Sequence, residues 1–366
     1  MASIETYSTK AGKRYRVRYR KPDHSQGAKR GFRTKREAEL YLASIEISKA
    51  RGEFVEHGAA RATIAELGQA WLSTQTHLKP STYRTVADAW RLRVEPRWGR
   101  YPVSAIQHSD VQAWVSELSA SRSPTVVIRS FGVLAAILDV AVRDRRILSN
   151  PARGITLPRK ERKTHSYLTH EQVHRLATEA GPRAALVLTL AYTGLRWGEV
   201  AALRVRSVDF ERRRINVTEN AVEVGGVIHV GSPKTYKTRS VPTPRFLHPY
   251  LNDQISGREG DELLFPGPNG DYMRRTRTST GSKSWFKTAL RNASLEPMTI
   301  HDLRHTAASL AVSSGANVKA VQRMLGHASA AMTLDVYSDL FDDDLDAVSD
   351  RLDQAVAAAS VSKPRP

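Results

Sequence analysis

The sequence predicts an α+β chain: a small N-terminal β-sheet with one helix, then an all-α segment, then a mainly α segment with a small antiparallel sheet. Two observations predict this division. The 366 residues exceed what one ordinary domain holds. The apolar pattern has strand period near the N-terminus, helical period over most of the chain, and strand period again between residues 215 and 242. Hydrophobic residues make up 40% and charged residues 25%, which excludes a low-complexity chain.

The N-terminal sheet is predicted from an alternation of arginine with apolar side chains. Between Arg14 and Arg20 every second residue is arginine, so one face of the strand is basic while tyrosine and valine occupy the other. A further strand is expected near residues 28–33, in a three-stranded sheet. Thr34 and Glu37 then form a capping box, which predicts that a helix begins there and packs against the sheet.

The all-α segment is predicted from four helical patterns. A capping box of Thr63 and Glu66 begins the first. The others are expected over residues 81–94, 109–118 and 123–145. Asn150-Pro151 ends the segment, and a basic, extended linker follows over residues 157–163.

The last segment begins with another capping box, formed by Thr169 and Gln172. Helices are expected through Leu190 and Val205 and again from Ser284 to Leu340. Strands are expected over residues 215–217, 222–230 and 240–242, with a polar turn over residues 232–238. An acidic stretch with an apolar stripe predicts a short amphipathic helix at the end, its stripe made of Leu345, Val348 and Leu352.

Charge is the compositional outlier. The chain has 56 Lys plus Arg against 37 Asp plus Glu, a net charge of +19. The first 36 residues hold 12 of these basic side chains against two acidic ones, so more than half of the excess lies there. A field of this strength concentrates polyanions around the protein. Nucleic acid is therefore the expected partner.

Several classes of protein are excluded. The chain has no cysteine, which removes disulfides, Cys-ligated zinc and thiol catalysis, and which fits a reducing cytoplasm. The first residues lack the basic start and apolar run of a signal peptide. The most apolar stretches, residues 184–192 and 131–142, are too short to span a bilayer. We therefore expect a cytoplasmic protein with no membrane partner.

Five separated motifs carry candidate chemistry. They are Thr193-Gly194-Leu195-Arg196-Trp197-Gly198-Glu199, Pro233-Lys234-Thr235, His301-Asp302-Leu303-Arg304-His305, Leu325-Gly326-His327, and Tyr337. A phosphodiester has a poor leaving group and a charged centre, so cleaving it without a metal requires cations where charge develops. A guanidinium is always charged and offers a planar fork of donors, so Arg196 and Arg304 suit the two non-bridging oxygens.

In order and spacing, these motifs resemble the tyrosine recombinases of the bacteriophage-integrase type. The resemblance covers about residues 168–340, and the segments upstream match the family's layout of an arm-type DNA binder followed by a helical core-site binder. It implies a catalytic set of Arg196, Lys234, His301, Arg304, His327 and the nucleophile Tyr337. Glu199 and His305 are then supporting residues.

The resemblance also implies individual roles. Tyr337 attacks the phosphorus, which leaves a 3′-phosphotyrosyl link and a free 5′-hydroxyl, so that rejoining needs no ATP. Lys234 protonates the departing 5′-oxygen, and Lys237, three residues on in the same turn, is the rival for this role. His301 relays or donates a proton. His327 hydrogen-bonds a phosphate oxygen.

No cofactor is expected, and a zinc site is the weaker interpretation of the histidines. His301 and His305 are four residues apart, as in the His-Glu-x-x-His zinc helix. Here, however, Asp302 replaces the glutamate and Arg304 would place a cation beside the metal, with no third ligand evident.

The domain boundaries that this interpretation predicts are an arm-type DNA-binding domain over 1–60, a helical core-binding domain over 61–153, a basic linker over 154–165, a catalytic domain with its C-terminal helix over 166–355, and a tail over 356–366. The basic residues expected to contact DNA lie in the first domain and the linker. They are Lys13, Arg14, Arg16, Arg18, Arg20, Arg33, Lys35, Lys160, Arg162 and Lys163.

The function predicted is that of a site-specific recombinase that integrates and excises a mobile or viral genome in a bacterial host. Four subunits would join two duplexes and exchange strands through a Holliday junction. Double-stranded DNA with core and arm-type sites, a DNA-bending host factor and an excisionase are the partners that the resemblance implies.

Two rival functions remain open. A type IB topoisomerase would share the chemistry but relax supercoils alone, and a non-catalytic DNA-binding protein would need no nucleophile. The sequence leaves open the attachment sites, the overlap length, the directionality factor, the host, and whether the C-terminal helix docks in cis or in trans.

Overall fold

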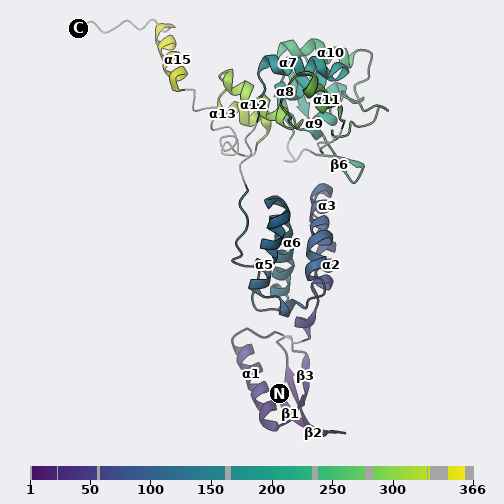
Figure 1. The fold of residues 1–366 in the computed structure, drawn as a ribbon, viewed down its shortest axis with the longest axis vertical. Helices are drawn as coiled ribbons and strands as arrows, with labels where there is room; N and C mark the ends of the chain where they lie inside the picture. Colours follow the sequence, from purple (N-terminus) through teal and green to yellow (C-terminus); the bar gives the residue numbers. More distant parts are fainter. Residues whose placement is uncertain are drawn as a thin grey trace, which may run out of the picture. The chain divides into compact units, whose positions relative to one another are not determined.

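The computed structural model describes residues 2–22, 24–55, 58–160, 166–232, 238–276, 283–327, 329 and 345–358 (Figure 1). The chain divides into two compact units, Met1–Glu161 and Arg162–Pro366. The elements alternate between small antiparallel sheets and helices, so the predicted α+β class is confirmed.

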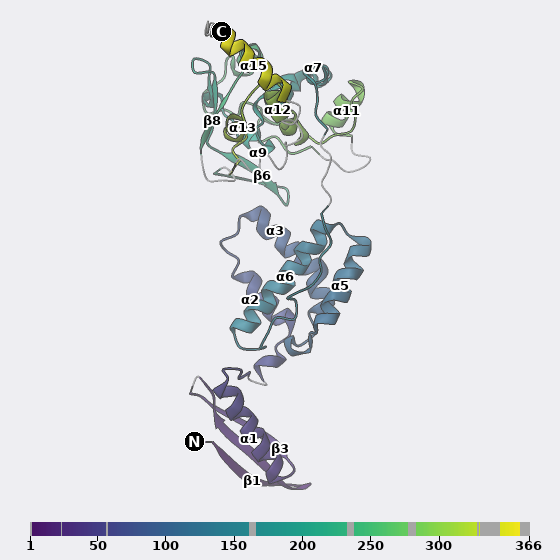
Figure 2. The same ribbon diagram turned by 90° about the vertical axis from the view of Figure 1, so that its left-hand side faces the viewer.

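The first unit begins with a three-stranded antiparallel sheet of order β1-β2-β3 and one helix, α1, along it (Figure 2). These elements are β1 (Ser3–Thr9), β2 (Gly12–Arg20), β3 (Gln26–Phe32) and α1 (Lys35–Ala50). The predicted alternation of β2 is confirmed, because Val17 and Tyr19 are buried against Ala38 and Ile45 of α1. The predicted capping box of Thr34 and Glu37 begins α1.

The rest of the first unit is helical. Its elements are α2 (Ile64–Ser73), α3 (Pro80–Ala89), a π-helical turn (Trp90–Val94), α4 (Glu95–Trp98), α5 (His108–Ser121) and α6 (Pro124–Arg143). The helix expected over 81–94 differs from the prediction, because α3 ends at Ala89, the chain widens into the π turn, and the short helix α4 follows. In the π turn the Trp90 ring packs directly over Gly68, where an added Cβ would come within 2.1 Å of it.

Helix α6 corrects one expectation. The apolar stretch at 131–142 is predicted to be too short for a bilayer, but it lies within α6, which has 20 residues and by length and composition could cross one. Its packing shows another use, because Val127, Leu134, Ile137 and Leu138 are fully buried in the core of the helical segment. Helix α6 is therefore apolar around most of its circumference because it lies at the centre of the core.

The second unit is built around α8, whose side chains are almost all buried and which packs against both α7 and α12. Its helices are α7 (His170–Glu179), α8 (Ala184–Thr193), α9 (Trp197–Ala201), α10 (His248–Ile255), α11 (Trp285–Asn292), α12 (Asp302–Ser313), α13 (Val318–Leu325) and α15 (Leu345–Ala358). Among the described residues, the short 3-10 helices are Ala59–Arg61, Val103–Ala105, Gly181–Arg183, Val205–Ser207 and Arg245–Leu247.

Two small antiparallel sheets complete the second unit. One has the order β4-β5-β8, and the other is the hairpin β6-β7. The strands are β4 (Val208–Asp209), β5 (Arg214–Val217), β6 (Asn220–Val224), β7 (Val227–Gly231) and β8 (Arg239–Pro242). Gly225 and Gly226 both have positive φ, as a tight two-residue hairpin turn requires. Strand β8 pairs with β5 and packs against α13, which brings residue 239 next to the end of that helix.

Candidate active site

Two glycine turns shape the site. Helix α8 ends at Gly194 and α13 ends at Gly326, and both glycines have a left-handed conformation, with φ of 63° and 65°. The turns are in close contact, since a Cβ at Gly194 would lie 2.6 Å from Cδ2 of Leu325. Arg196 and His327 follow directly after these turns, so two motifs 130 residues apart meet.

Arg304 joins the two turns from α12. Its side chain is only 3% exposed. Nη1 donates to the carbonyl oxygen of Gly194 at 2.5 Å, and Nη2 donates to the carbonyl oxygen of Leu325 at 2.6 Å. The buried guanidinium therefore satisfies the last carbonyls of two helices, and its charge is fixed before any substrate arrives.

Arg196 is held by a buried carboxylate. Glu199 is fully buried and accepts hydrogen bonds from the backbone N–H of Arg196 at 2.8 Å and from its Nη1 at 3.0 Å. Arg239, the first residue of β8, donates to both oxygens of the same carboxylate at 2.7 and 2.6 Å. Burial alone would raise the pKa of Glu199, but the hydrogen bonds and charges of Arg239 and then Arg196 outweigh it and hold the pKa below its ordinary value.

The two histidines near the arginines are held neutral. The pKa of His327 is lowered to about 4 by burial and by the guanidinium groups of Arg304, Arg196 and Arg239. The pKa of His301 is also lowered, by desolvation and by Arg304, against a smaller opposing effect of Asp302. Both imidazoles are therefore uncharged at neutral pH, so each can donate one hydrogen bond and accept another.

The site has a net positive charge. Arg196, Arg239 and Arg304 contribute three charges, and Glu199 removes one. Such a site favours an anion with several oxygen acceptors, as a phosphodiester has. His305 lies beside His301, with ring centroids 5.4 Å apart and an edge-on arrangement. Within the described residues, no group of three His, Asp or Glu side chains is placed to hold a metal ion.

The structure brings together most of the predicted set, but some members lie outside the described residues. Arg196, Glu199, Arg304 and His327 surround the two glycine turns, and His301 and His305 lie at the start of α12. The candidates that fall outside the described residues are Lys234, its rival Lys237, and Tyr337.

Sequence reasoning missed Arg239. It was not among the candidates, because nothing in its neighbourhood links it to a glutamate 40 positions earlier. The predicted strand over 240–242 was the only local signal, and it did not identify the residue that begins the strand. The pairing of β8 with β5 and its packing against α13 create the contact.

The basic face of the N-terminal sheet is present, with one carboxylate on it. Arg14, Arg16, Arg18 and Arg20 alternate with the buried side chains of β2, whereas Lys13 lies on the opposite face with Tyr15. Glu5 on β1 pairs with Arg16 and lies 3.2 Å from Nε of Arg18. Of the other candidates, Arg33, Lys35 and Lys160 are exposed, and Arg162 and Lys163 lie outside the described residues.

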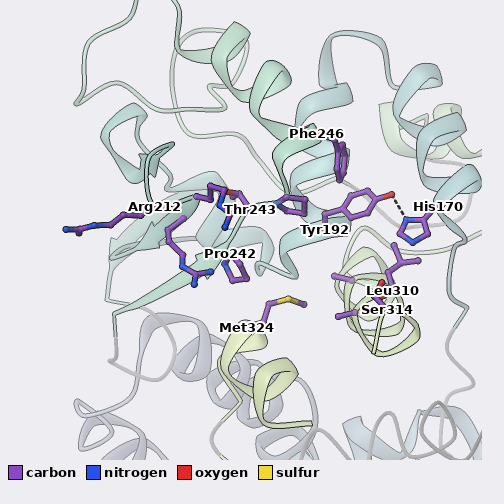
Figure 3. Close-up of a pocket in the computed structure, with 14 residues that line it drawn as sticks. His170, Tyr192, Arg212, Pro242, Thr243, Phe246, Leu310, Ser314 and Met324 are labelled. Carbon is purple, nitrogen blue, oxygen red and sulfur yellow. Dashed lines mark hydrogen bonds between the residues drawn. The ribbon is translucent and has the colours of Figure 1, made fainter. Parts of the chain in front are cut away.

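The second unit also has a separate cavity of about 470 Å³ (Figure 3). Tyr192 and Phe246 line it with apolar residues of α12 and with Met324, and three consecutive arginines, 212–214, lie at its edge. The Tyr192 hydroxyl lies 2.8 Å from Nδ1 of His170. None of the predicted catalytic residues lines this cavity.

Comparisons with known proteins identify relatives of this chain. Residues 166–343 match the phage integrase family, and residues 63–119 match the phage integrase N-terminal SAM-like domain. The putative prophage phiRv2 integrase of Mycobacterium tuberculosis is 30% identical over 284 residues, which cover 75% of this chain and 73% of the relative.

Solved structures show the same fold. The Tn1549 transposon integrase in complex with transposon right end DNA matches with a TM-score of 0.67 at 24% identity, over 80% of this chain and 99% of that one. A lambda integrase tetramer bound to a Holliday junction matches with a TM-score of 0.57 at 17% identity, over 89% and 96% of the two chains.

The family model and the relatives show a DNA strand-cleaving and rejoining enzyme of the tyrosine recombinase class. The chain belongs to the phage integrase family. The resemblance inferred from the motifs is therefore confirmed, and site-specific DNA recombination is the established class of its activity.

Proposed function

We propose that this protein integrates and excises a mobile genome by cutting one strand of each duplex at a time through a 3′-phosphotyrosyl intermediate. The observation that carries the proposal is the assembly of Arg196, Arg304 and His327 around two contacting glycine turns. This cluster supplies fixed positive charge and a neutral donor at one point, as stabilising the charge that develops on a phosphorus centre requires.

The proposed reaction uses side chains only. Arg196 and Arg304 bind the non-bridging oxygens, and His327 donates a hydrogen bond to one of them. The phenolic oxygen of Tyr337 gives its proton to the neutral imidazole of His301 and bonds to phosphorus as the bond to the 5′-oxygen breaks, and Lys234 gives the departing 5′-oxygen a proton. Because the phosphotyrosyl bond keeps the bond energy, a 5′-hydroxyl can reverse the step without ATP or metal.

The proposed domains divide binding from chemistry. Residues 1–60 bind arm-type sites through the basic face of the sheet, residues 61–153 bind the core site, 154–165 link them to the catalytic domain over 166–355, and 356–366 form a tail. Support for the first assignment comes from the row of arginines on β2, since phosphate contacts position a protein on DNA. The protein is proposed to act on DNA in the cytoplasm of a bacterial host.

Assembly is proposed to be tetrameric, with a Holliday junction as the intermediate and with a DNA-bending host factor and an excisionase as further partners. The tetramer of lambda integrase on a Holliday junction supports this by likeness of fold. On α15, Leu352 and Val356 are 62% and 55% exposed and lie one helical turn apart. We propose that this stripe enters the cavity beside arginines 212–214 of a neighbouring subunit, where the acidic residues of α15 meet positive charge.

Sedimentation with a core duplex tests the assembly. Wild type should form a four-subunit complex on two duplexes, whereas Leu352→Asp should stop at single occupied duplexes while binding core DNA as before. A tetramer that persists in Leu352→Asp would contradict docking of this stripe.

A nicked duplex that traps the covalent product tests the proposed chemistry. Wild type, Tyr337→Phe and Tyr250→Phe are incubated with candidate attachment cores in EDTA, and protein–DNA adducts are separated on a denaturing gel. Tyr250 is an exposed tyrosine on α10 and serves as the matched control. Adducts should form with wild type and Tyr250→Phe and not with Tyr337→Phe.

Each other result has a meaning. Adducts with Tyr337→Phe would show that another residue is the nucleophile. Adducts that form without any joining of a second duplex would favour a topoisomerase. DNA binding without adducts across the full set of cores would favour a non-catalytic binding protein.

A further inference from the structure

The contact of Arg239 with Glu199 is the feature of the site that the predicted catalytic set does not use. The Arg239 side chain is 12% exposed, and both of its Nη atoms donate to Glu199. Its Nε is buried and has no hydrogen-bond acceptor among the described residues. Both ends of its fork of donors are therefore directed at Glu199.

The Glu199 carboxylate is saturated. A carboxylate offers about four lone-pair sites. Oε1 accepts from Nη1 of Arg196 and Nη1 of Arg239, and Oε2 accepts from the backbone N–H of Arg196 and Nη2 of Arg239. Arg239 therefore fills two of the four sites and limits the guanidinium of Arg196 to a single bond with this carboxylate.

Arg239 also contacts the other half of the site. A Cβ at Gly326 would lie 2.9 Å from both Cδ and Nε of Arg239, so its side chain packs directly beneath the turn that leads to His327. Its charge is also one of those that lower the pKa of His327. Arg239 thus contacts both the carboxylate of Glu199, which holds Arg196, and the turn at Gly326, which precedes His327.

We propose that Arg239 is a positioning residue for strand cleavage. By saturating Glu199 it keeps that carboxylate from chelating Arg196 with both oxygens, so the remaining donors of Arg196 stay directed to the scissile phosphate. It also fixes the backbone before His327. This inference rests on the proposed function, because it needs Arg196 to act on the phosphate.

The chain order adds a second consequence. Arg239 begins β8 directly after the stretch that contains the two candidate lysines, five and two positions earlier in the sequence. Its bond to Glu199 therefore fixes the start of β8 beside Arg196, a few positions after both candidate lysines in the sequence.

The test uses single-turnover cleavage of a trapping core duplex at saturating protein, with core affinity measured in parallel. Arg239→Gln should slow cleavage on the order of 100-fold, the effect expected of a misplaced catalytic group, with core affinity nearly unchanged. Arg239→Lys should recover part of the rate, because an ammonium restores the charge but not the fork of donors. Arg206→Gln, which removes an exposed arginine paired with Asp261, should cleave as wild type does.

The double variant Glu199→Gln with Arg239→Gln distinguishes positioning from a structural role. Removing both partners leaves no carboxylate to capture Arg196, so the double variant should cleave faster than Arg239→Gln alone. Thermal unfolding of each variant shows that it is folded under the assay conditions.

Three results would overturn the inference. They are wild-type cleavage by Arg239→Gln, a double variant that is as slow as or slower than Arg239→Gln, and a loss of core affinity that matches the loss of rate. In each case cleavage by wild type would leave the proposed function intact, whereas absence of cleavage by wild type would remove the proposed function itself.

Discussion

In both the N-terminal sheet and the catalytic unit, two arginines pair with one glutamate, but the sheet pair is exposed to solvent and the catalytic pair is buried. On the sheet, Glu5 is 37% exposed and pairs with Arg16 and Arg18. In the catalytic unit, Glu199 is fully buried and pairs with Arg196 and Arg239. The exposed pair is the weaker one, because ion pairs in solvent contribute only about 0–1 kcal/mol to stability and are screened by salt.

A buried pair behaves differently. Removing one partner leaves an uncompensated charge in a medium that cannot solvate it, which costs about 3–5 kcal/mol. The sheet arginines can therefore exchange their carboxylate for DNA phosphates at little cost, whereas the arginines of the site are held in one geometry before DNA arrives. We therefore expect variants of the sheet to change DNA binding and its salt dependence, and variants of the site to change the stability of the protein and the rate of cleavage.

Arg304→Ala should have the largest effect. It leaves the buried carbonyls of Gly194 and Leu325 without their donor, so the free energy of unfolding should fall by about 3 kcal/mol. Urea unfolding checks this, with Arg18→Ala as the control, for which a change below about 1 kcal/mol is expected. Equal losses in the two variants would end the distinction between the two regions.

Gly326→Ala should have the next largest effect. Gly326 and Gly257 both have positive φ, of 65° and 72°, so alanine costs backbone strain at either position. Only at Gly326 does the added Cβ meet Arg239, at 2.9 Å. Gly326→Ala should therefore destabilise the protein by about 1 kcal/mol more than Gly257→Ala and should also slow cleavage. If Gly326→Ala and Gly257→Ala have the same melting curve and the same cleavage rate, the turn at Gly326 tolerates a shift of the Arg239 side chain.

The pH dependence of stability should show the effect of His327. Its pKa is about 4 in the folded protein and near 6.5 when unfolded, so the unfolded chain binds more protons between these values. The stability contribution is fully present above about pH 6.5 and is lost as pH falls toward 4. Urea unfolding at pH 7.5 and 5 should show a smaller decrease for His327→Gln than for wild type. If His327→Gln loses as much stability as wild type between pH 7.5 and pH 5, another group, such as His301, causes the pH dependence.

Glu5→Gln should have the smallest effect of these variants, and it should strengthen the binding of duplex DNA. Removing the carboxylate releases Arg16 and Arg18 to phosphates, so affinity for duplex DNA at low salt should rise about two- to fivefold. Glu46→Gln on α1 makes the same change in net charge without touching the sheet arginines and should raise affinity less. Equal gains would show that only net charge matters.

Local features of this fold could be predicted from the sequence, while long-range ones could not. The capping boxes of Thr34, Thr63 and Thr169 begin their helices as predicted, because cap and partner are three residues apart. The contact of Arg239 with Glu199 depends on how a strand packs against a helix, and no local pattern encodes that.

Arg304 shows the same limit within the site. Its motif predicts a phosphate clamp, and that role stays a prediction. The sequence could not show that both Nη atoms also bond the carbonyls that end α8 and α13. Such a buried bridge becomes visible only once three segments, each distant in sequence, lie together.

Cleavage of a duplex that carries a core site and no arm site tests the central claim most directly. Arg196→Lys and Arg20→Lys are compared with wild type under single turnover at saturating protein. Arg196→Lys should slow cleavage on the order of 100-fold with little change in affinity, because a held guanidinium acts on the phosphate. Arg20→Lys should cleave at the wild-type rate. Equal cleavage rates for the two variants, or a slow rate of Arg196→Lys that excess protein returns to the wild-type value, would contradict the role of Arg196 in cleavage.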